Sequence, residues 1–256
     1  MNMKNEFILG YRIITETKER CVARIVEWIE NGEECRFLAC ANPHSLQVAR
    51  KDPFFEEALK SADILIPDGS GLLLGARILG VGIESRVTGS DIFLGLSRVL
   101  NGRTGYSQFF LGTTEENLNN LRQKAEREFP SILTAGTYSP PFRDDFSEAE
   151  NREMLQAINN ASPDILWVGM TAPKQEKWIY KNRNRLKVKF VAAVGAVFDF
   201  YTGRVKRSHP VFQNMGLEWL PRLVRQPRRM WKRNFVSNTS FVVRVVGEAV
   251  RRKRGV

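Results

Sequence analysis

The sequence is poor in the residues that build metal centres and disulfide frameworks. Its 256 residues include only two histidines and three cysteines. The cysteines, Cys21, Cys35 and Cys40, are odd in number and match no disulfide or zinc-binding spacing, so we expect reduced thiols. His44 and His209 lie far from any cysteine pair, which argues against a zinc site. We therefore expect a protein without a bound metal.

Long apolar runs are also missing. The longest, residues 190–198, is far shorter than the ~20 residues that a membrane-spanning helix needs, and we interpret it as a buried strand. The first residues include Lys4 and Glu6 and do not resemble a targeting signal. These features predict a cytoplasmic protein that is soluble or held peripherally at a membrane.

Acidic residues are scarce in the last fifth of the chain. Residues 204–256 contain 14 Lys and Arg against Glu218 and Glu248, whereas residues 1–203 contain 25 Lys and Arg against 26 Asp and Glu. The net charge of +11 therefore resides entirely in this final segment. Such asymmetry indicates a polyanionic partner, and a nucleic acid, an anionic membrane and a lipid diphosphate all satisfy it.

The commonest nucleotide-binding motifs are absent as well. Residues 112–114 follow an expected strand as a phosphate loop would, but they lack the P-loop lysine. Residues 80–82 fail the three-glycine dinucleotide pattern, which weakens a dehydrogenase hypothesis. Asp144 and Asp145 are the one carboxylate pair that resembles a metal-binding transferase motif, and their Pro-rich flank favours a loop.

Short apolar strands alternate with amphipathic helices along most of the chain. Residues 7–14 predict a strand or hairpin arm. Further strands are expected at 35–41, 62–67, 108–111, 132–138, 164–168 and 188–194. Helices are expected at 17–31, 45–50, from 53 onward, 71–79, 91–100, 115–129, 147–161 and 173–186. This alternation predicts an α/β fold with a mostly parallel, Rossmann-like sheet and helices on both faces.

The pattern becomes purely helical after residue 211. On a helical wheel of residues 217–235, Arg222, Arg225 and Arg229 fall on a basic arc opposite an apolar one, as in helices that lie at membrane interfaces. We therefore divide the chain into an α/β core at 1–203 and a basic amphipathic helical appendage at 204–256.

Four polar patches follow expected strands, at residues 42–46, 67–71, 86–91 and 172–178. Polar residues at strand ends form the ligand crevice of an open α/β sheet. In the second patch, Asp68 stands between a strand and Gly69, where it is either a general base or part of an ordinary Asp-Gly turn. The residues alone leave both interpretations open.

The other patches are equally two-sided. Arg86 before a helix start suits a diphosphate, or is a plain surface charge. Thr88 and Asp91 suit the same ligand or helix capping. Asn42 is compatible with a sugar contact or an Asx turn. Residues 174–176 offer an amide and charged groups to a sugar or uracil, or form a solvated first helical turn.

Taken in this order, and with residues 193–200 and 216–220, the four patches resemble the WecG/TagA/CpsF family of bacterial glycosyltransferases. The resemblance implies transfer of a sugar from a UDP-sugar to a polyprenyl-diphosphate-linked saccharide at the inner face of the membrane, with inversion and without a metal or cofactor. It implies that Asp68 is the catalytic base. The implied donor-binding residues are Asn42, Arg86, Thr88, Asp91, Lys174, Gln175 and Glu176. The implied acceptor-binding residues are Cys40, Arg222, Arg225 and Arg229.

The resemblance leaves the sugar open. Family members use several sugars, and N-acetylmannosamine is our first choice. Relatives often have Thr where this chain has Cys40. The sugar that the relatives use can therefore not be assigned directly to this chain. A nucleic-acid-binding module using the basic segment and a nucleotide-sugar hydrolase or epimerase remain alternatives. Nucleic acid is not an expected partner, because the segment lacks the exposed, spaced aromatics of a stacking platform. A homo-oligomer is compatible with the sequence.

Overall fold

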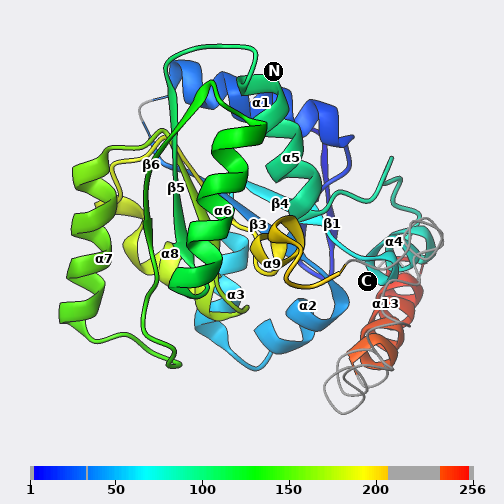
Figure 1. Cartoon of the computed structure of the whole chain (residues 1–256). Coiled ribbons are helices and arrows are strands. Elements are labelled where there is room, and N and C mark those ends of the chain that lie inside the picture. The colour runs from blue at the N-terminus through cyan, green and yellow to red at the C-terminus, as the bar shows by residue number, and fades with distance from the viewer. Residues whose placement is uncertain (1–2, 33, 207–236, 254–256) are drawn as a thin grey trace.

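The computed structural model describes residues 3–32, 34–206 and 237–253. Within them the chain forms a six-stranded sheet, a separate hairpin and surrounding helices (Figure 1). The hairpin is β1 (Asn5–Ile8) and β2 (Tyr11–Ile14). The strands of the sheet are β3 (Arg36–Ala41), β4 (Ile64–Pro67), β5 (Tyr106–Gly112), β6 (Ile132–Tyr138), β7 (Ile165–Gly169) and β8 (Phe190–Ala193).

The helices fill the connections between strands. They are α1 (Lys18–Asn31), α2 (Pro43–Ala49), α3 (Pro53–Lys60), α4 (Ser70–Ile78), α5 (Gly89–Leu100), α6 (Glu115–Glu128), α7 (Glu148–Ala161), α8 (Lys174–Asn182), α9 (Val197–Thr202) and α13 (Ser237–Lys253). Side-chain caps explain several starts: the Asp52 carboxylate accepts the Phe55 N–H at 3.1 Å, and Ser147 and Glu150 form the expected capping box.

The large sheet is parallel throughout, in the order β4-β3-β8-β7-β5-β6. The predicted α/β class is therefore confirmed. Its strands are continuous apolar runs because helices cover both faces. Strands β3 and β4 pair so that Ala41 lies beside Pro67. The residues that follow them, Asn42 and Asp68, therefore leave the sheet at neighbouring positions.

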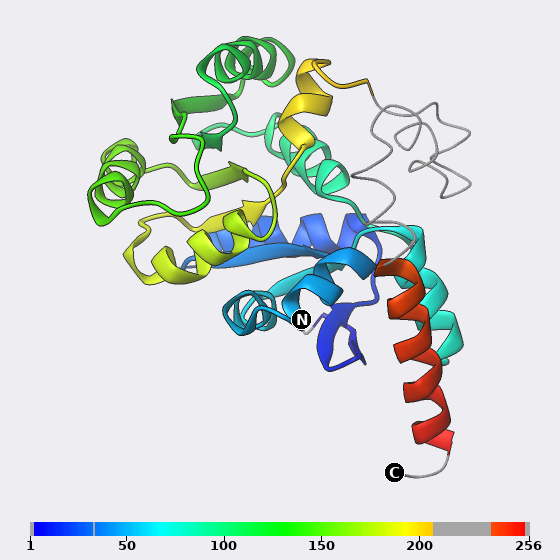
Figure 2. The ribbon, with the colours of Figure 1, turned by 90° about the horizontal axis from the view of Figure 1, so that it is seen from below.

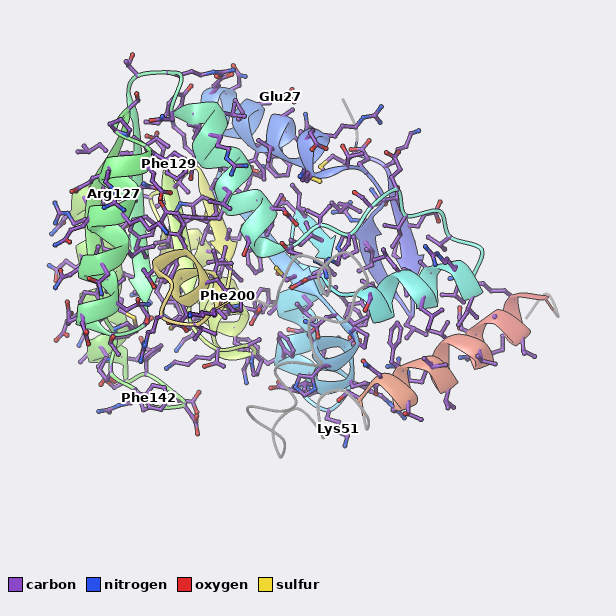
Figure 3. The ribbon with its side chains drawn as sticks, turned by 45° about the vertical axis from the view of Figure 1, so that its right-hand side comes forward. Glu27, Lys51, Arg127, Phe129, Phe142 and Phe200 are labelled. Atoms are coloured by element: carbon purple, nitrogen blue, oxygen red, sulfur yellow. The ribbon has the colours of Figure 1, made fainter. Side chains whose placement is uncertain are left out.

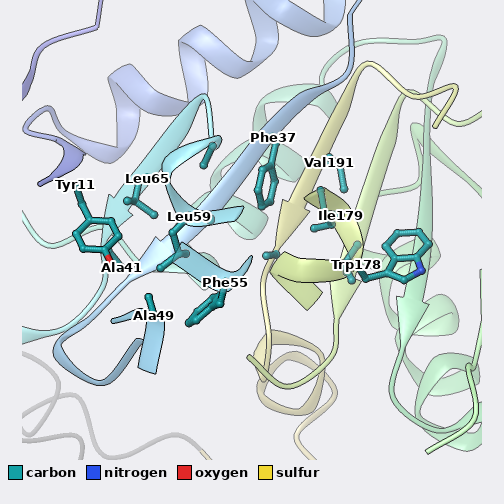
Figure 4. Packing of buried hydrophobic residues seen from close by; sticks show 14 of the residues in the cluster. Tyr11, Phe37, Ala41, Ala49, Phe55, Leu59, Leu65, Trp178, Ile179 and Val191 are labelled. Atoms are coloured by element: carbon teal, nitrogen blue, oxygen red, sulfur yellow. The ribbon is translucent and has the colours of Figure 1, made fainter. Parts of the chain in front are cut away.

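Each face of the sheet has its own apolar core. Helices α1, α5, α6 and α9 contribute to one core. Helices α2, α3, α4, α7, α8 and α13, together with the hairpin, contribute to the other. Figure 4 shows the second core, where Phe37 and Val191 of the sheet lie near Leu59 and Ile179 of the covering helices. Both faces are thus dry, and ligands can reach the sheet only at its edges and ends.

Two sequence-based boundaries were wrong. Residues 190–198 are not one strand, because β8 ends at Ala193 and Gly195, with φ +58°, turns the chain into α9. A left-handed residue interrupts a strand whatever the hydropathy around it. The helix expected at 173–186 stops at Asn182 and continues only as a 3₁₀ turn at Arg183–Arg185.

Helix α13 belongs to the predicted appendage and lies side by side with α4 (Figures 1 and 2). Its Phe241 and Val245 are completely buried. Gly75 of α4 makes this approach possible, because a Cβ there would stand 2.7 Å from the Phe241 ring. The described end of the appendage is therefore packed on the core. Arg222, Arg225 and Arg229 lie outside the described residues.

Candidate active site

A cavity of about 930 Å³ opens at the carboxyl edge of the sheet. Residues from the ends of all six parallel strands line it, as expected for the crevice of an open α/β sheet. The structure brings eight of the sequence-predicted site residues into this lining: Cys40, Asn42, Asp68, Arg86, Thr88, Lys174, Gln175 and Glu176.

Asp68 is fixed where β4 meets the cavity. Its N–H group donates to the carbonyl of Ala41 at 2.8 Å and to that of Ile66 at 3.0 Å. Gly69 follows with φ +112° and ψ 141°, a conformation essentially restricted to glycine. The Asp-Gly pair is thus a turn, as the plainer interpretation held, and this turn sets the Asp68 side chain in the cavity wall.

Helix α4 begins directly after this turn and points its N-terminus at the cavity. No side chain of the described residues caps it, and Gly69, Ser70 and Gly71 all line the cavity. Gly71 lets α4 approach α2 closely, since a Cβ there would stand 2.7 Å from Cγ of Pro43. A helix start with this exposure suits an anion, because backbone N–H groups and the helix dipole both favour negative charge.

Asn42 is the N-cap of α2. Its Oδ1 accepts the Ser45 N–H at 3.0 Å, while its own N–H donates to Ser45 Oγ at 2.9 Å. Capping therefore occupies the carbonyl end of the Asn42 side chain. The residue also lines the cavity. Within the described chain its amide Nδ2 makes no hydrogen bond and is available to a ligand.

Thr88 and Asp91 form the capping box of α5. The Thr88 hydroxyl donates to Asp91 Oδ2 at 2.7 Å, and the Thr88 N–H donates to the same oxygen at 2.9 Å. Thr88 borders the cavity, but Asp91 is not among the residues lining it. The structure thus engages Asp91 in the helix start, where the sequence had placed it among the donor-binding residues. Arg86, two residues before Thr88, does line the cavity.

Gln175 and Glu176 form a buried polar pair at the start of α8, with exposed fractions of 3% and 2%. Gln175 Oε1 accepts the Gly195 N–H at 2.9 Å, and its Nε2 donates to Glu176 Oε1 at 2.8 Å. The second carboxyl oxygen, Glu176 Oε2, is buried and has no partner among the described residues. Burial raises the pKa of Glu176 to about 7, because desolvation disfavours the charged form.

Lys174 and Cys40 complete the predicted set. The Lys174 ammonium donates to the Arg143 carbonyl and stands 4.1 Å from the centre of the Phe146 ring, which anchors it to the loop after β6. Burial lowers the pKa of Lys174, against the opposing effect of nearby Asp144 and Asp145.

The Cys40 thiol lies near two carboxyl groups, those of Asp68 and Glu176. Burial, with these two groups nearby, raises the pKa of the thiol well above its usual value, so that it stays protonated at neutral pH.

Several lining residues were not among the predicted site residues. Thr113 and Ser139 follow β5 and β6, and Ser139 Oγ donates to the Thr113 carbonyl at 2.7 Å. Phe142 is fully exposed at the tip of the loop after β6, and Phe200 lies on α9 near the centre of the view in Figure 3. Their common signal is position, since each follows a parallel strand, but only the sheet order shows that they border one cavity.

The structure also shows whether the described residues could form a metal site or a membrane-spanning helix. The described residues contain no group of three or more His, Cys, Asp or Glu side chains arranged to hold a metal ion. Among the same residues, every helix is too short or too polar to cross a bilayer.

Comparison with known proteins gives a consistent result. Residues 7–255 match the sequence profile of the Glycosyl transferase WecG/TagA/CpsF family. Relatives named N-acetylglucosaminyldiphosphoundecaprenol N-acetyl-beta-D-mannosaminyltransferase occur in Bacillus spizizenii (32% identity over 197 residues, covering 77% of this chain and 74% of the relative) and in Bacillus subtilis (29% over 217 residues, covering 84% and 81%). A Staphylococcus aureus protein of the same name is 24% identical over 230 residues, covering 88% and 85%.

Proposed function

Because the chain belongs to the WecG/TagA/CpsF family of glycosyl transferases, we propose that it moves a sugar from a UDP-linked donor to a saccharide carried on a polyprenyl diphosphate. The observation that carries this proposal is the position of one carboxylate. Asp68 lies in the cavity wall directly before the N-terminus of α4. A base and an anion site therefore stand next to each other, as a transfer between a diphosphate donor and a hydroxyl acceptor requires.

In this proposal Asp68 is the general base. Its carboxylate takes the proton of the acceptor hydroxyl as that oxygen forms a bond to the anomeric carbon of the donor sugar. The bond between the anomeric carbon and the diphosphate oxygen breaks, and UDP leaves with the electron pair. Attack from the face opposite the leaving group inverts the anomeric configuration. A positioned base of this kind contributes roughly 10²–10⁴-fold to the rate.

The negative charge that develops on the diphosphate is neutralised by groups of the protein. Arg86 and the N-terminus of α4 line the same cavity and supply a guanidinium and backbone N–H groups. Such groups replace the divalent cation that many nucleotide-sugar enzymes use. On this proposal a metal chelator leaves the rate of UDP release unchanged.

The relatives' names suggest the sugar and the acceptor. N-acetylmannosamine is the proposed sugar, and a polyprenyl-diphosphate-linked N-acetylglucosamine is the proposed acceptor. A smaller recess of about 330 Å³ adjoins the cavity and shares Gly71 and Asn238 with it, while Leu74 and Phe241 make its wall apolar. It suits the first isoprene units of such a lipid. Arg222, Arg225 and Arg229 are the proposed contacts of the acceptor diphosphate, with the enzyme peripheral on the inner membrane face.

The test measures UDP release from UDP-N-acetylmannosamine, with and without a short-chain polyprenyl-diphosphate-linked N-acetylglucosamine. We expect release only when the lipid is present. Asp68→Asn should lower that rate by about 10²–10⁴-fold with an unchanged circular dichroism spectrum. Asp145→Asn, which alters an exposed carboxylate in the loop after β6, is the matched control and should keep the wild-type rate.

Two results would overturn the proposal. Wild-type activity in Asp68→Asn would remove the base. Release of UDP without any lipid acceptor would identify a nucleotide-sugar hydrolase instead.

A further inference from the structure

Glu176 presents the one unexplained polar atom of the cavity wall among the described residues. The side chain is 2% exposed, yet the residue lines the cavity. Its Oε1 accepts a hydrogen bond from Gln175, while Oε2 is buried without any partner. A buried polar atom left unsatisfied costs about 1–3 kcal/mol, so its retention points to a partner that the bound ligand supplies.

The hydrogen-bond chain through Gln175 fixes which oxygen of Glu176 does what. The Gly195 N–H can only donate, so the Gln175 oxygen must face it and the Gln175 amide nitrogen must face Glu176. Glu176 Oε1 is therefore an acceptor. If the carboxyl group carries a proton, that proton belongs on Oε2, where it makes this oxygen a hydrogen-bond donor.

Burial of Glu176 favours the protonated acid, against the opposing effect of the hydrogen bonds from Gln175 and from its own backbone N–H. The factors that set its pKa are burial, the Gln175 hydrogen bond and its own backbone N–H, and no cation is among them. The titratable groups beside it are the Cys40 thiol of β3 and, acting on that same thiol, the Asp68 carboxylate after β4. An ionised Glu176 would add a further negative charge to a cavity proposed to hold a diphosphate, whereas a neutral acid adds none.

The wall beside Glu176 is small and apolar. Cys40 and Ala193 meet there, with the Cys40 Sγ 3.6 Å from the Ala193 carbonyl oxygen. Gly195 adds no side chain, and a Cβ placed on it would already lie 3.6 Å from the Gln175 amide. Space of this kind suits a methyl group next to an oxygen that accepts a hydrogen bond, which is the chemistry of an acetamido substituent.

We propose that Glu176, as a neutral acid, donates its Oε2–H to the carbonyl oxygen of an acetamido group on the donor sugar and so selects N-acetylated donors. The inference rests on the proposed function, because it takes the cavity to hold a UDP-sugar. Gln175 is a positioning residue, since it acts only by holding the Glu176 carboxyl group.

The test uses direct binding, which needs neither an acceptor nor turnover. Calorimetry at pH 6 compares UDP-N-acetylmannosamine with UDP-mannose, which differ in the acetamido group. Wild type should bind the acetylated donor about tenfold more tightly, and Glu176→Ala should reduce this ratio to near one. Glu116→Gln, an exposed change on α6, should keep the wild-type ratio. An unchanged ratio in Glu176→Ala overturns the proposal, as does a wild-type protein that shows no preference.

Glu176→Gln gives a second readout. Unlike Glu176→Ala, it keeps the volume of the side chain and leaves no empty space in the wall. Its side-chain oxygen still accepts from Gln175, which leaves its NH₂ at the place of Oε2 as a permanent donor. In wild type the preference for the acetylated donor should fall as the pH rises from 6 to 8.5. In Glu176→Gln the preference should persist across this range. A preference that falls equally in both proteins overturns the assignment.

The outcomes also separate this inference from the proposed function. Lipid-dependent UDP release without an effect of Glu176 on the preference removes only the role of Glu176. A clear Glu176-dependent preference in binding, without transfer to any lipid-linked saccharide, removes only the transferase proposal.

Discussion

Glu176 illustrates the loss of stability that accompanies a buried polar side chain proposed to bind a ligand. Its carboxyl group is almost completely buried and has one unsatisfied oxygen, where an apolar side chain of similar size would have packed without a penalty. Strain and unsatisfied groups of this kind concentrate at functional sites, because the surrounding structure fixes them in place. The cost should appear as a dependence of stability on pH.

We predict that Glu176→Gln is more stable than wild type at pH 8 and equally stable near pH 4.5. The pKa of Glu176 is raised from 4.5 to about 7, so between these values the native state binds more protons than the unfolded state. The free energy of unfolding of wild type therefore falls as the pH rises through this window. The difference should reach about 3 kcal/mol above pH 7. Urea unfolding at several pH values measures it.

The control for this experiment is Glu116→Gln, whose carboxylate is exposed and whose stability difference from wild type should not change with pH. An equal gain for Glu176→Gln at pH 4.5 and pH 8 would contradict the prediction, since it would reflect packing and not protonation.

Single residues also show where sequence reasoning reaches the site and where it stops. Asn42 and Asp68 were predictable, because a polar residue directly after an apolar strand faces the carboxyl edge of a parallel sheet. The burial of Glu176 was not, since it depends on Cys40 of β3 and on Gly195 in the turn after β8, which only the folded chain brings to it. Asp91 shows the limit of spacing: its distance from Thr88 in the sequence fits both a cap and a ligand contact, and the hydrogen bonds of the structure identify the cap.

The polar side chains at the two ends of the strands have different surroundings. At the amino ends Asp63 pairs with Arg36 at 3.0 Å and with Arg183 at 2.6 Å. Asp164 likewise accepts from the Ser107 hydroxyl at 2.9 Å and pairs with Lys189 at 3.1 Å. These charges are matched within the fold. The polar groups at the carboxyl ends instead border a cavity. Both ends of the strands carry polar side chains, but those at the amino ends are paired with each other and those at the carboxyl ends face the cavity.

Helix α13 is the element that links the basic end of the chain to the cavity. It contacts α4 through Phe241 and Val245, and its Asn238 lines the cavity. Ser237 Oγ lies 2.9 Å from Nδ1 of His44 on α2. Displacement of α13 should therefore disturb the cavity wall as well as the core.

We predict that Gly75→Leu destabilises the protein by about 3 kcal/mol and loosens α13, because even a Cβ at this position would lie 2.7 Å from the buried Phe241 ring. Hydrogen exchange of the amides of Ser237–Lys253 should become faster relative to those of α1. Gly247→Leu places the same side chain on the open face of α13, where nothing lies within 4 Å, and should not destabilise the helix. Equal exchange in the two variants would contradict the prediction.

Hydrophobic periodicity predicted nearly every element but could not place α13. The helices of residues 3–203 were recognisable because their apolar residues repeat at a period of 3.6, and most strands because they are short apolar runs. The docking of α13 depends on Gly75, a missing side chain that gives no periodic signal. The end of β8 was missed for a similar reason, since the left-handed turn at Gly195 interrupts an apolar run without changing its hydropathy.

Along the whole chain, the basic charge concentrates in the last fifth of the sequence. The core to residue 203 carries a net charge of −1 and the remainder +12. The exposed side of α4 and α13 also carries large apolar residues, with Leu74 exposed by 49%, Val243 by 67% and Val246 by 46%. On helix α13 the apolar residues occur together with the exposed Arg251 and Arg252. Cationic and apolar groups together favour an anionic bilayer, whose surface contributes about 1 kcal/mol for each nearby basic residue.

We predict that the full chain binds vesicles containing phosphatidylglycerol and that Arg222→Ala, Arg225→Ala and Arg229→Ala combined weaken this binding by at least tenfold. The reason is the loss of three cations from the basic segment, each of which contributes about 1 kcal/mol at low salt. Cosedimentation at two salt concentrations measures the effect, and the difference between variant and wild type should shrink as salt rises.

The matched control removes three exposed arginines from the core, as Arg98→Ala, Arg127→Ala and Arg152→Ala. Of these three, Arg127 is labelled in Figure 3, where it lies on the side of the molecule away from α13. If both triple variants lose binding equally, net charge and not the basic segment determines attachment, and the proposed role of the basic segment at the membrane loses its support.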